Sequence, residues 1–196
     1  MRKFIQVRGC MGSGKTTVVR QFLNQYASEV RFIEIFGKQY PYTVIPELNI
    51  VISGRYDRAI CGGIDGIIRN KNLMKEYIFA LIKKLSPTAF IFEAVMYGIT
   101  FKFTNDLYNM SQARGYSFTA IALVSAFDVN LQRIEARNGG KPIKVDAFEK
   151  QYSRYISSTL KLKDSGIPIN IVKTDNIKFE NMHNIIEEVI YDKKNS

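Results

Sequence analysis

The chain has 196 residues, which is enough for one α/β domain with a small inserted lid and too few for a second core. Its apolar fraction of 46% is typical of a globular protein, and no apolar run approaches the roughly 20 residues that span a bilayer. The formal net charge of +10 fits a polyanionic partner such as DNA or RNA, and fits a basic surface without such a partner equally well. We therefore expect one domain over residues 1–196 that does not associate with a membrane.

The N-terminus and the cysteines indicate an intracellular protein. Arg2 and Lys3 lead directly into a strand pattern, without the longer apolar stretch and cleavage site of a signal peptide. Cys10 and Cys61 lie in separate glycine-rich segments, which disfavours a structural disulfide and fits the reducing cytosol. The only histidine, His183, is far along the chain from every motif, so a zinc site is not expected. The predicted localisation is cytoplasmic, in the host cell if the protein is viral.

The first motif in chain order is a glycine-rich loop over residues 9–16, which fits the phosphate-binding pattern G-x-x-x-x-G-K-[ST]. Residues 3–8 before it have a strand pattern, and apolar residues after it recur at helical spacing from Lys15. Such a loop directs backbone N–H groups at a phosphate, with Lys15 reaching the β- and γ-phosphates and Thr16 holding Mg²⁺. The sequence therefore predicts a nucleoside triphosphate site. Its residues are Gly9, Gly12, Ser13, Gly14, Lys15, Thr16 and Thr17, and the three glycines are expected to let the backbone approach the phosphates.

Strand and helix patterns alternate along the rest of the chain. Strands are expected at residues 30–36, 48–53, 88–92, 117–125 and 168–173, with an irregular connection over residues 37–47. Helices are expected at residues 72–85, 104–114, 128–137, 146–164 and 179–191, with Asp128 as an N-cap and Phe179 turned inward. This alternation predicts a mostly parallel sheet with helices on both faces, which binds its ligands at the carboxyl ends of the strands.

Glycines, arginines and carboxylates cluster after the strand at residues 48–53, as in a substrate site. The glycines would admit a ligand, Arg55 and Arg58 suit a phosphate, and Tyr56 could stack on a base. The carboxylates of Asp57, Asp65 and Glu93 compete as the base for an attacking hydroxyl. Glu93 is preferred as base or Mg²⁺ ligand, because a charge at the end of an apolar strand is costly unless it is used; as a structural acid it would pair with Lys15 or Thr16. The predicted substrate-binding residues are Arg55, Tyr56, Asp57, Arg58, Gly62, Gly63 and Asp65.

A candidate lid covers about residues 133–145. Arg133 and Arg137 are four residues apart on a predicted helix, so both guanidinium groups project from one face. There they could clamp transferring phosphoryl oxygens or stack on adenine, and the Asn-Gly-Gly sequence at residues 138–140 is the predicted hinge. A solvated helix face is the alternative. Lys141 and Arg154 are weaker candidates on the same side.

Three classes of phosphate-loop protein compete at this point. A motor or remodelling ATPase would be larger and would show a strand that ends in Asp-Glu. A regulatory GTPase would carry an Asn-Lys-x-Asp motif, which this sequence lacks. A small kinase needs a phosphate loop, an acceptor site and an arginine-bearing lid, and the chain has a candidate for each. The alternative from another class is a nucleic-acid-binding ATPase that transfers no phosphoryl group to an acceptor.

These motifs resemble the P-loop nucleoside and nucleotide kinase superfamily over nearly the whole chain. The resemblance implies a three-layer α/β sandwich around a five-stranded, mostly parallel sheet, with the first and third strands in the middle. It also implies ATP with Mg²⁺ as the donor, and an adenine site beside Thr174 and Asp175. Several nucleotide kinases carry Asp-Arg-Tyr or Asp-Arg-Ser where residues 93–98 here read Glu-Ala-Val-Met-Tyr-Gly, which disfavours an ordinary thymidylate kinase.

The Arg-Tyr-Asp and Cys-Gly-Gly-x-Asp patterns at residues 55–57 and 61–65 are similar to bacteriophage kinases that act on 5-hydroxymethyluridine in DNA. A nucleoside monophosphate attacks as an anion and needs no base, so three available carboxylates favour a hydroxyl acceptor. The positive charge over residues 55–84 agrees with a duplex or flipped-base substrate. The predicted function is Mg²⁺-dependent transfer of the γ-phosphoryl group of ATP to a nucleobase-bearing acceptor. A free nucleoside or nucleoside monophosphate is the alternative acceptor, and the oligomeric state stays open.

Overall fold

The computed structural model describes residues 1–58, 62–141 and 143–192, so Cys61 of the acceptor pattern and Pro142 of the candidate lid lie outside the described residues. The strands are β1 (Arg2–Arg8), β2 (Glu29–Ile35), β3 (Lys38–Ile45), β4 (Ile50–Ser53), β5 (Ala89–Glu93), β6 (Tyr116–Val124) and β7 (Ile169–Lys173). The helices are α1 (Lys15–Leu23), α2 (Lys71–Leu85), α3 (Phe101–Gln112), α4 (Phe127–Arg137), α5 (Val145–Asp164) and α6 (Asn184–Ile190). Short 3₁₀ turns are formed by Pro46–Leu48, Ile64–Gly66 and Phe179–Asn181.

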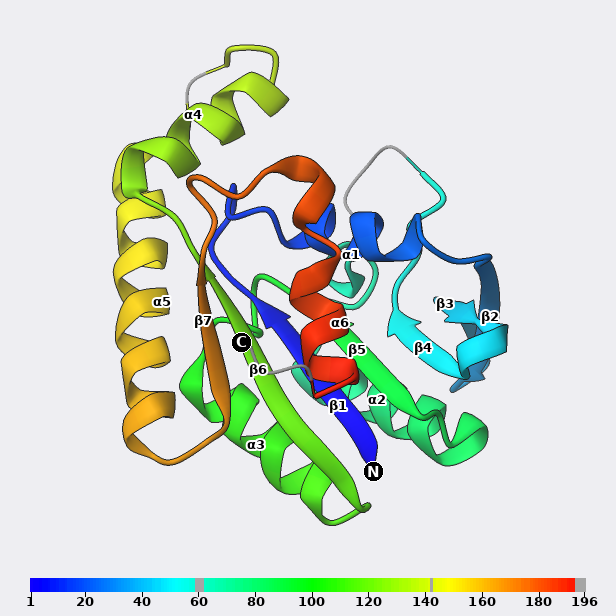
Figure 1. Cartoon of the computed structure of the whole chain (residues 1–196). Coiled ribbons are helices and arrows are strands. Elements are labelled where there is room, and N and C mark those ends of the chain that lie inside the picture. The colour runs from blue at the N-terminus through cyan, green and yellow to red at the C-terminus, as the bar shows by residue number, and fades with distance from the viewer. Residues whose placement is uncertain (59–61, 142, 193–196) are drawn as a thin grey trace.

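The strands form one sheet in the order β2-β3-β4-β5-β1-β6-β7 (Figure 1). The five strands from β4 to β7 in this order are parallel, and β1 and β5, the first and third of them along the chain, lie side by side in the interior. This confirms the α/β kinase fold and the strand order implied by the resemblance. The β2–β3 hairpin adds two antiparallel strands beyond β4.

The hairpin shows that the irregular connection expected over residues 37–47 is wrong, because Lys38–Ile45 forms β3. A proline inside this stretch argued against a strand, since proline has no N–H to donate. Pairing between β3 and β4 begins only at Tyr42, so Pro41 lies where β3 pairs with β2 alone. The carbonyl of Pro41 also accepts a hydrogen bond of 2.7 Å from the Tyr77 hydroxyl on α2. The strand therefore tolerates its proline.

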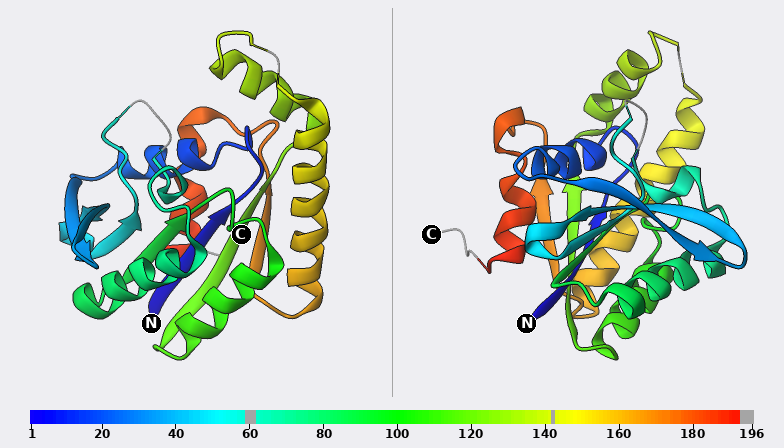
Figure 2. Two further views of the ribbon diagram at one scale, coloured as in Figure 1. Left: turned by 180° about the vertical axis from the view of Figure 1, so that it is seen from behind. Right: turned by 90° about the vertical axis from the view of Figure 1, so that its right-hand side faces the viewer.

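Helices cover both faces of the sheet (Figure 2). Successive side chains of a strand point to opposite faces, so Phe4 of β1 packs with α2 and α3 while Ile5 packs with α1 and α6. The helix α5 runs along the β7 edge, where Phe148 and Tyr155 form a third apolar cluster with residues of α4 and β6. These layers place the carboxyl ends of the parallel strands at one end of the molecule.

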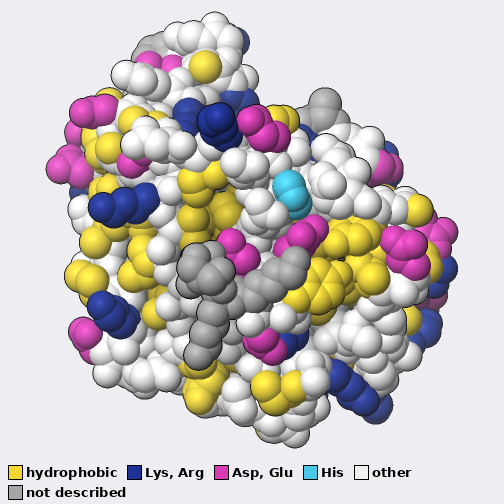
Figure 3. Space-filling view, viewed as in Figure 1, with side chains coloured by type: hydrophobic (Ala, Val, Ile, Leu, Met, Phe, Trp, Pro, Cys, Tyr) yellow, Lys and Arg dark blue, Asp and Glu magenta, His cyan; other side chains and the backbone are white. Residues whose placement is uncertain are grey.

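The expectations for Asp128 and Phe179 are wrong, and the structure gives the position of His183. The N-cap position of α4 is Ala126, with Asp128 inside the first turn, and Phe179 is 60% exposed rather than turned inward. His183 is half-buried just before α6 and is visible on the face shown in Figure 3. Its Nδ1 lies 2.7 Å from the carbonyl oxygen of Glu180. Within the described ranges, no helix is both long and apolar enough to cross a membrane.

Candidate active site

The glycine loop follows β1 directly and ends where α1 begins. Gly14 is the N-cap residue of α1 and has a φ of 90°, in the left-handed region that glycine adopts without strain. A Cβ atom at this position would meet nothing within 4 Å. Gly14 therefore borders open space, where the backbone N–H groups at the start of α1 can meet an anion.

The other two glycines make room for the protein's own atoms. A Cβ at Gly9 would lie 2.2 Å from Ser13 Oγ, and a Cβ at Gly12 would lie 2.6 Å from the carbonyl oxygen of Asn130. The expectation that all three glycines serve the phosphates is therefore corrected. Gly9 admits the buried Ser13 side chain and Gly12 admits the backbone of α4, which leaves Gly14 on the open side of the loop.

Arg133 and Thr174 brace the glycine loop from the other side. Arg133 donates from Nη1 to the Gly12 carbonyl at 3.4 Å and from Nη2 to the Thr174 carbonyl at 3.0 Å. The buried Thr174 hydroxyl donates to the Ser13 carbonyl at 3.2 Å. The start of the candidate lid thus touches both the phosphate loop and the segment expected beside adenine.

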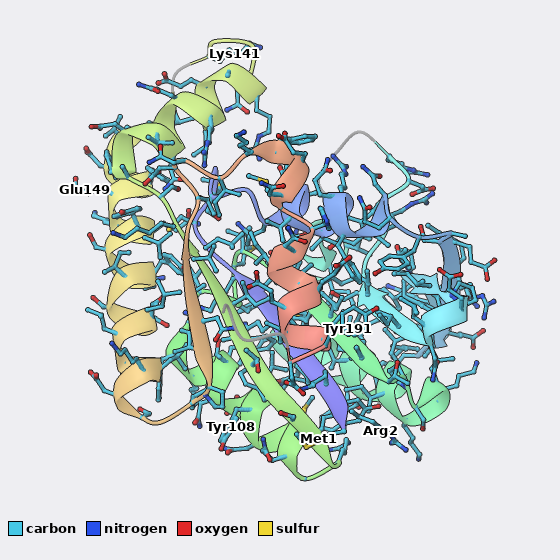
Figure 4. The ribbon with its side chains drawn as sticks, in the orientation of Figure 1. Met1, Arg2, Tyr108, Lys141, Glu149 and Tyr191 are labelled. Atoms are coloured by element: carbon cyan, nitrogen blue, oxygen red, sulfur yellow. The ribbon has the colours of Figure 1, made fainter. Side chains whose placement is uncertain are left out.

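The other lid and adenine-side candidates lie farther from the loop. Arg137 and Arg154 are exposed, and Lys141 lies at the tip of the connection beyond α4 (Figure 4). Asp175 uses Oδ1 to accept a hydrogen bond of 3.0 Å from the backbone N–H of Ala126, which ties the loop after β7 to the start of α4. Their expected roles in holding ATP stay predictions.

Glu93 is the last residue of β5, and the parallel register pairs it with Val7 on β1. The carboxylate is buried and both of its oxygens accept hydrogen bonds. Thr16 donates to Oε1 at 2.7 Å, and the hydroxyl of Tyr56 donates to Oε2 at 2.7 Å. Lys15 lies nearby in the loop and donates from Nζ to the carbonyl of Cys10 at 2.7 Å. One carboxylate therefore joins the phosphate loop to the predicted acceptor segment.

Two glycines of the acceptor segment lie against Tyr56 and Glu93. A Cβ at Gly62 would lie 2.3 Å from the ring of Tyr56, and a Cβ at Gly63 would lie 3.3 Å from the carboxyl carbon of Glu93. We expected these glycines to admit a ligand, but the space beside them is filled by the Tyr56 ring and the Glu93 carboxylate. Tyr56 is only 9% exposed, so the expected stacking of its ring on a base is also corrected.

Asp57 forms an ion pair with Arg55 at the surface. The Nε of Arg55 donates to Oδ1 at 2.8 Å, and its Nη2 donates to Oδ2. This hydrogen bonding holds the pKa of the Asp57 carboxyl below its usual range, which makes the carboxylate a weaker base. The neighbouring Arg58 accepts from Arg20 of α1 through its backbone carbonyl. Of the proposed bases, Asp57 is therefore less suited than Glu93.

Asp65 holds the segment that follows Glu93. Its Oδ2 accepts hydrogen bonds from the backbone N–H groups of Val95 and Met96, the second at 3.2 Å. Burial raises the pKa of the Asp65 carboxyl, and the two N–H groups oppose this shift. Asp65 was a candidate base, but its contacts indicate that it positions the backbone beside Glu93.

Two polar residues of β1 hold the far end of the same segment, and sequence reasoning missed both. Gln6 donates from Nε2 to the carbonyl of Gly98 at 3.2 Å, and Arg8 donates from Nη2 to the carbonyl of Ile99 at 3.1 Å. Arg8 is fully buried over the ring of Tyr155, and burial lowers the pKa of its guanidinium to about 10. The available signal was a pair of polar residues at alternate positions in a buried strand, which is costly without partners.

The residues around Glu93 fit a magnesium triphosphate. Mg²⁺ prefers oxygen ligands, and the Thr16 hydroxyl and Glu93 carboxylate offer them 2.7 Å apart. The open N-terminus of α1 at Gly14 fits the phosphates, since its N–H groups and its positive helix end favour an anion.

A family model described as "5-hmdU DNA kinase" matches residues 2–184. The chain belongs to this family. The match covers the glycine loop, the Tyr56–Glu93 pair and the candidate lid, and it confirms the resemblance to the phage 5-hmdU DNA kinases that the sequence indicated.

Curated relatives agree with this membership. The chain is 35% identical over 148 residues to the 5-hmdU DNA kinase of Pseudomonas phage M6, covering 74% of this chain and 76% of that protein. It is 31% identical over 168 residues to the 5-hmdU DNA kinase of Bacillus phage SP10, covering 83% of this chain. The match covers 25% of the SP10 protein, so the chain corresponds to about a quarter of that relative.

Solved structures show that the fold is shared more widely. The tunicamycin resistance protein of Deinococcus radiodurans superposes with a TM-score of 0.55 at 12% identity and covers 96% of each chain. Shikimate kinase from Acinetobacter baumannii superposes with a TM-score of 0.52 at 14% identity, covering 100% of this chain and 97% of that one. At these identities the comparison supports the architecture that the 5-hmdU DNA kinase family uses, and not a choice of acceptor.

Proposed function

We propose that the chain transfers the γ-phosphoryl group of ATP, with Mg²⁺, to the 5-hydroxymethyl group of 5-hydroxymethyluridine in DNA. The observation that carries this proposal is the position of Glu93, which accepts from Thr16 of the phosphate loop and from Tyr56 of the acceptor segment. A carboxylate between donor and acceptor sites suits a hydroxyl, which has a proton to lose. The family match supports the modified base as acceptor, and the net charge of +10 is compatible with DNA as its carrier.

The donor half of the site is proposed to act by positioning and charge. The N–H groups at the start of α1 and the Lys15 ammonium would bind the β- and γ-phosphates. Thr16 would hold Mg²⁺ directly and Glu93 would hold it through water, and the ion would neutralise charge on the phosphates. Arg133, already in contact with the loop, and Arg137 would neutralise the charge that develops on the transferred group.

The reaction proposed is an in-line displacement. The hydroxymethyl oxygen forms a bond to the γ-phosphorus, the bond from this phosphorus to the β,γ-bridging oxygen breaks, and ADP leaves. The hydroxyl proton passes to a carboxylate. Glu93 fits this role better than Asp57, because Asp57 is exposed and its pKa is held low by Arg55. The products are ADP and a phosphate monoester on the modified base.

Labelled ATP tests the proposal against its alternatives. We expect γ-³²P label to enter an oligonucleotide with 5-hydroxymethyluridine, and not an otherwise identical oligonucleotide with thymine. Lys15→Ala should abolish the transfer, because it removes the charge expected at the γ-phosphate. Lys150→Ala, at an exposed position on α5, is the matched control and should keep wild-type transfer.

Three results would contradict the proposal in different ways. Label in free nucleosides or nucleoside monophosphates, and not in DNA, would identify a small-molecule kinase. Label only in free phosphate with every acceptor would identify an ATPase. Transfer retained in Lys15→Ala would show that the loop does not bind the donor as proposed.

A further inference from the structure

A pocket with a volume of about 570 Å³ lies between α1, the β2–β3 hairpin and the segment after β4. The right-hand view of Figure 2 shows α1 and the hairpin side by side on this flank of the molecule. The α1 wall includes Thr17, Arg20 and Asn24, and Phe179 lines the pocket from the 3₁₀ turn before α6. Of the residues predicted for the site, Thr17, Tyr56 and Asp57 line this pocket.

The pocket shares a wall with the proposed reaction centre. Tyr56 lines the pocket and donates its hydroxyl to Glu93 at 2.7 Å. Thr17 also lines it and directly follows Thr16, the second donor to Glu93. A group bound in the pocket would therefore lie next to a group that reacts at Glu93.

Charged side chains of both signs line the pocket. Its two lining carboxylates are Glu29 and Asp57, which form ion pairs with Arg31 and Arg55 respectively. Arg20 is also in the wall, and it donates a hydrogen bond to the backbone carbonyl of Arg58. Because both lining carboxylates are paired with arginines, the guanidinium of Arg20 is the charged group of the wall that suits a phosphodiester.

Phe179 gives the pocket an aromatic surface. Its side chain is 60% exposed, whereas the apolar residues of α6 that follow it, such as Ile186, are buried. An exposed aromatic ring beside arginines is the usual platform for a base of single-stranded nucleic acid. The hydroxyl of Thr17 and the amide of Asn24 add hydrogen-bonding groups to the same cavity.

We infer that this pocket binds the nucleotide next to the target nucleotide in a DNA strand. Phe179 stacks on the base of that neighbour, and Arg20 binds the phosphate that joins it to the target. The inference rests on the proposed function, since it assumes that the target hydroxyl reacts at Glu93. It adds that the enzyme binds the neighbouring base and the linking phosphate of the DNA strand as well as the target base.

The test compares acceptor oligonucleotides with an intact or an abasic neighbour on either side of 5-hydroxymethyluridine. In the wild-type protein, one abasic neighbour should raise the KM for DNA about fivefold or more, because base–aromatic stacking has this strength. Phe179→Ala should raise the KM for the intact oligonucleotide by a similar factor and should no longer respond to the abasic site. The KM for ATP should stay unchanged. Phe36→Ala, at an 80% exposed ring on the turn between β2 and β3, is the matched control and should behave as wild type.

Salt dependence tests the phosphate contact independently. Arg20→Gln should reduce the slope of log K against log salt for DNA binding by about one, whereas Lys150→Gln should leave the slope unchanged. The inference is overturned if Phe179→Ala raises the KM equally for intact and abasic acceptors, or changes neither. A wild-type protein that labels no 5-hydroxymethyluridine DNA would overturn the proposed function instead, so the two failures are distinguishable.

Discussion

The hydroxyl of Tyr56 donates a hydrogen bond of 2.7 Å to Glu93 Oε2, across 37 residues of sequence. Thr16 donates to the other oxygen of the same carboxylate, so Tyr56 fixes the direction of Glu93 from the acceptor side. When Thr16 turns to a metal ion, Tyr56 would remain to hold the carboxylate in place. This makes Tyr56 a positioning residue whose loss should affect the chemical step more than donor binding.

Tyr56→Phe should lower kcat on the order of tenfold, because a hydrogen bond to a charged group contributes about 1.5–3 kcal/mol. The ring still fits against Gly62, so the KM for ATP should be unchanged. Steady-state kinetics with 5-hydroxymethyluridine DNA would measure both constants. Tyr108→Phe, on α3, is the control and should match wild type. An unaltered kcat in Tyr56→Phe would show that the bond does not orient Glu93 for the reaction.

Gly62→Ala should damage the site more than Gly66→Ala. A Cβ at Gly62 would lie 2.3 Å from the Tyr56 ring, whereas a Cβ at Gly66 would meet nothing within 4 Å. The first variant must displace the ring, at a cost of about 1–3 kcal/mol in the free energy of unfolding. Urea unfolding and kcat would both report this loss. Equal stability and activity in the two variants would contradict the packing described here.

Asp65→Asn should gain stability relative to wild type as the pH rises. Burial raises the folded-state pKa of Asp65 above its unfolded value, so the folded wild type binds the extra proton and loses stability as pH rises through that pKa. The asparagine has no such titration. Unfolding free energies between about pH 4 and pH 7 should therefore diverge in favour of the variant. A constant difference across this range would contradict the burial of a charged Asp65.

Asp65→Ala supplies the complementary test of the same residue. It removes the acceptor for the N–H groups of Val95 and Met96, and the loss of a hydrogen bond costs about 0.5–1.5 kcal/mol. The alanine variant should be less stable than the asparagine variant at every pH. It should also lower kcat, because the segment beside Glu93 loses its support.

Arg133→Ala and Arg137→Ala should separate structural support of the glycine loop from neutralisation of charge on the phosphates. Arg133 bonds the carbonyls of Gly12 and Thr174, so its loss should lower Tm and raise the KM for ATP. Arg137 is exposed, so its loss should leave Tm unchanged and lower kcat only if the lid brings it to the phosphates. Thermal unfolding with and without ATP, together with kinetics, would show the split. A lower Tm in Arg137→Ala, or an unchanged Tm in Arg133→Ala, would contradict these roles.

The parts of this protein that the sequence predicted are those encoded locally. The glycine loop and the apolar parallel strands carry their signal within a few residues, and both are confirmed in the fold. The strand at Lys38–Ile45 was missed because Pro41 is a local signal against a strand, and only the one-sided pairing beyond Tyr42 makes it acceptable.

The contacts inside the site could not be predicted in the same way. That Gly62 admits the Tyr56 ring, or that Gly9 admits Ser13, depends on the packing of segments whose positions the sequence does not state. The role of Glu93 as base stays a prediction, but its position beside the phosphate loop did follow from its place at the end of a strand. The supporting role of Asp65 did not, because backbone N–H groups leave no trace in composition.

The register that pairs Val7 with Glu93 sets the spacing between the carboxylate and the glycine loop by hydrogen-bonded strands rather than by loops. The segments at residues 54–58 and 94–98 approach Glu93 from outside this framework. A variant library confined to these two segments, with Tyr56 kept, would vary the accepted alcohol while the donor geometry stays constant. If the proposed function holds, the sheet allows acceptor choice to be engineered separately from phosphoryl donation.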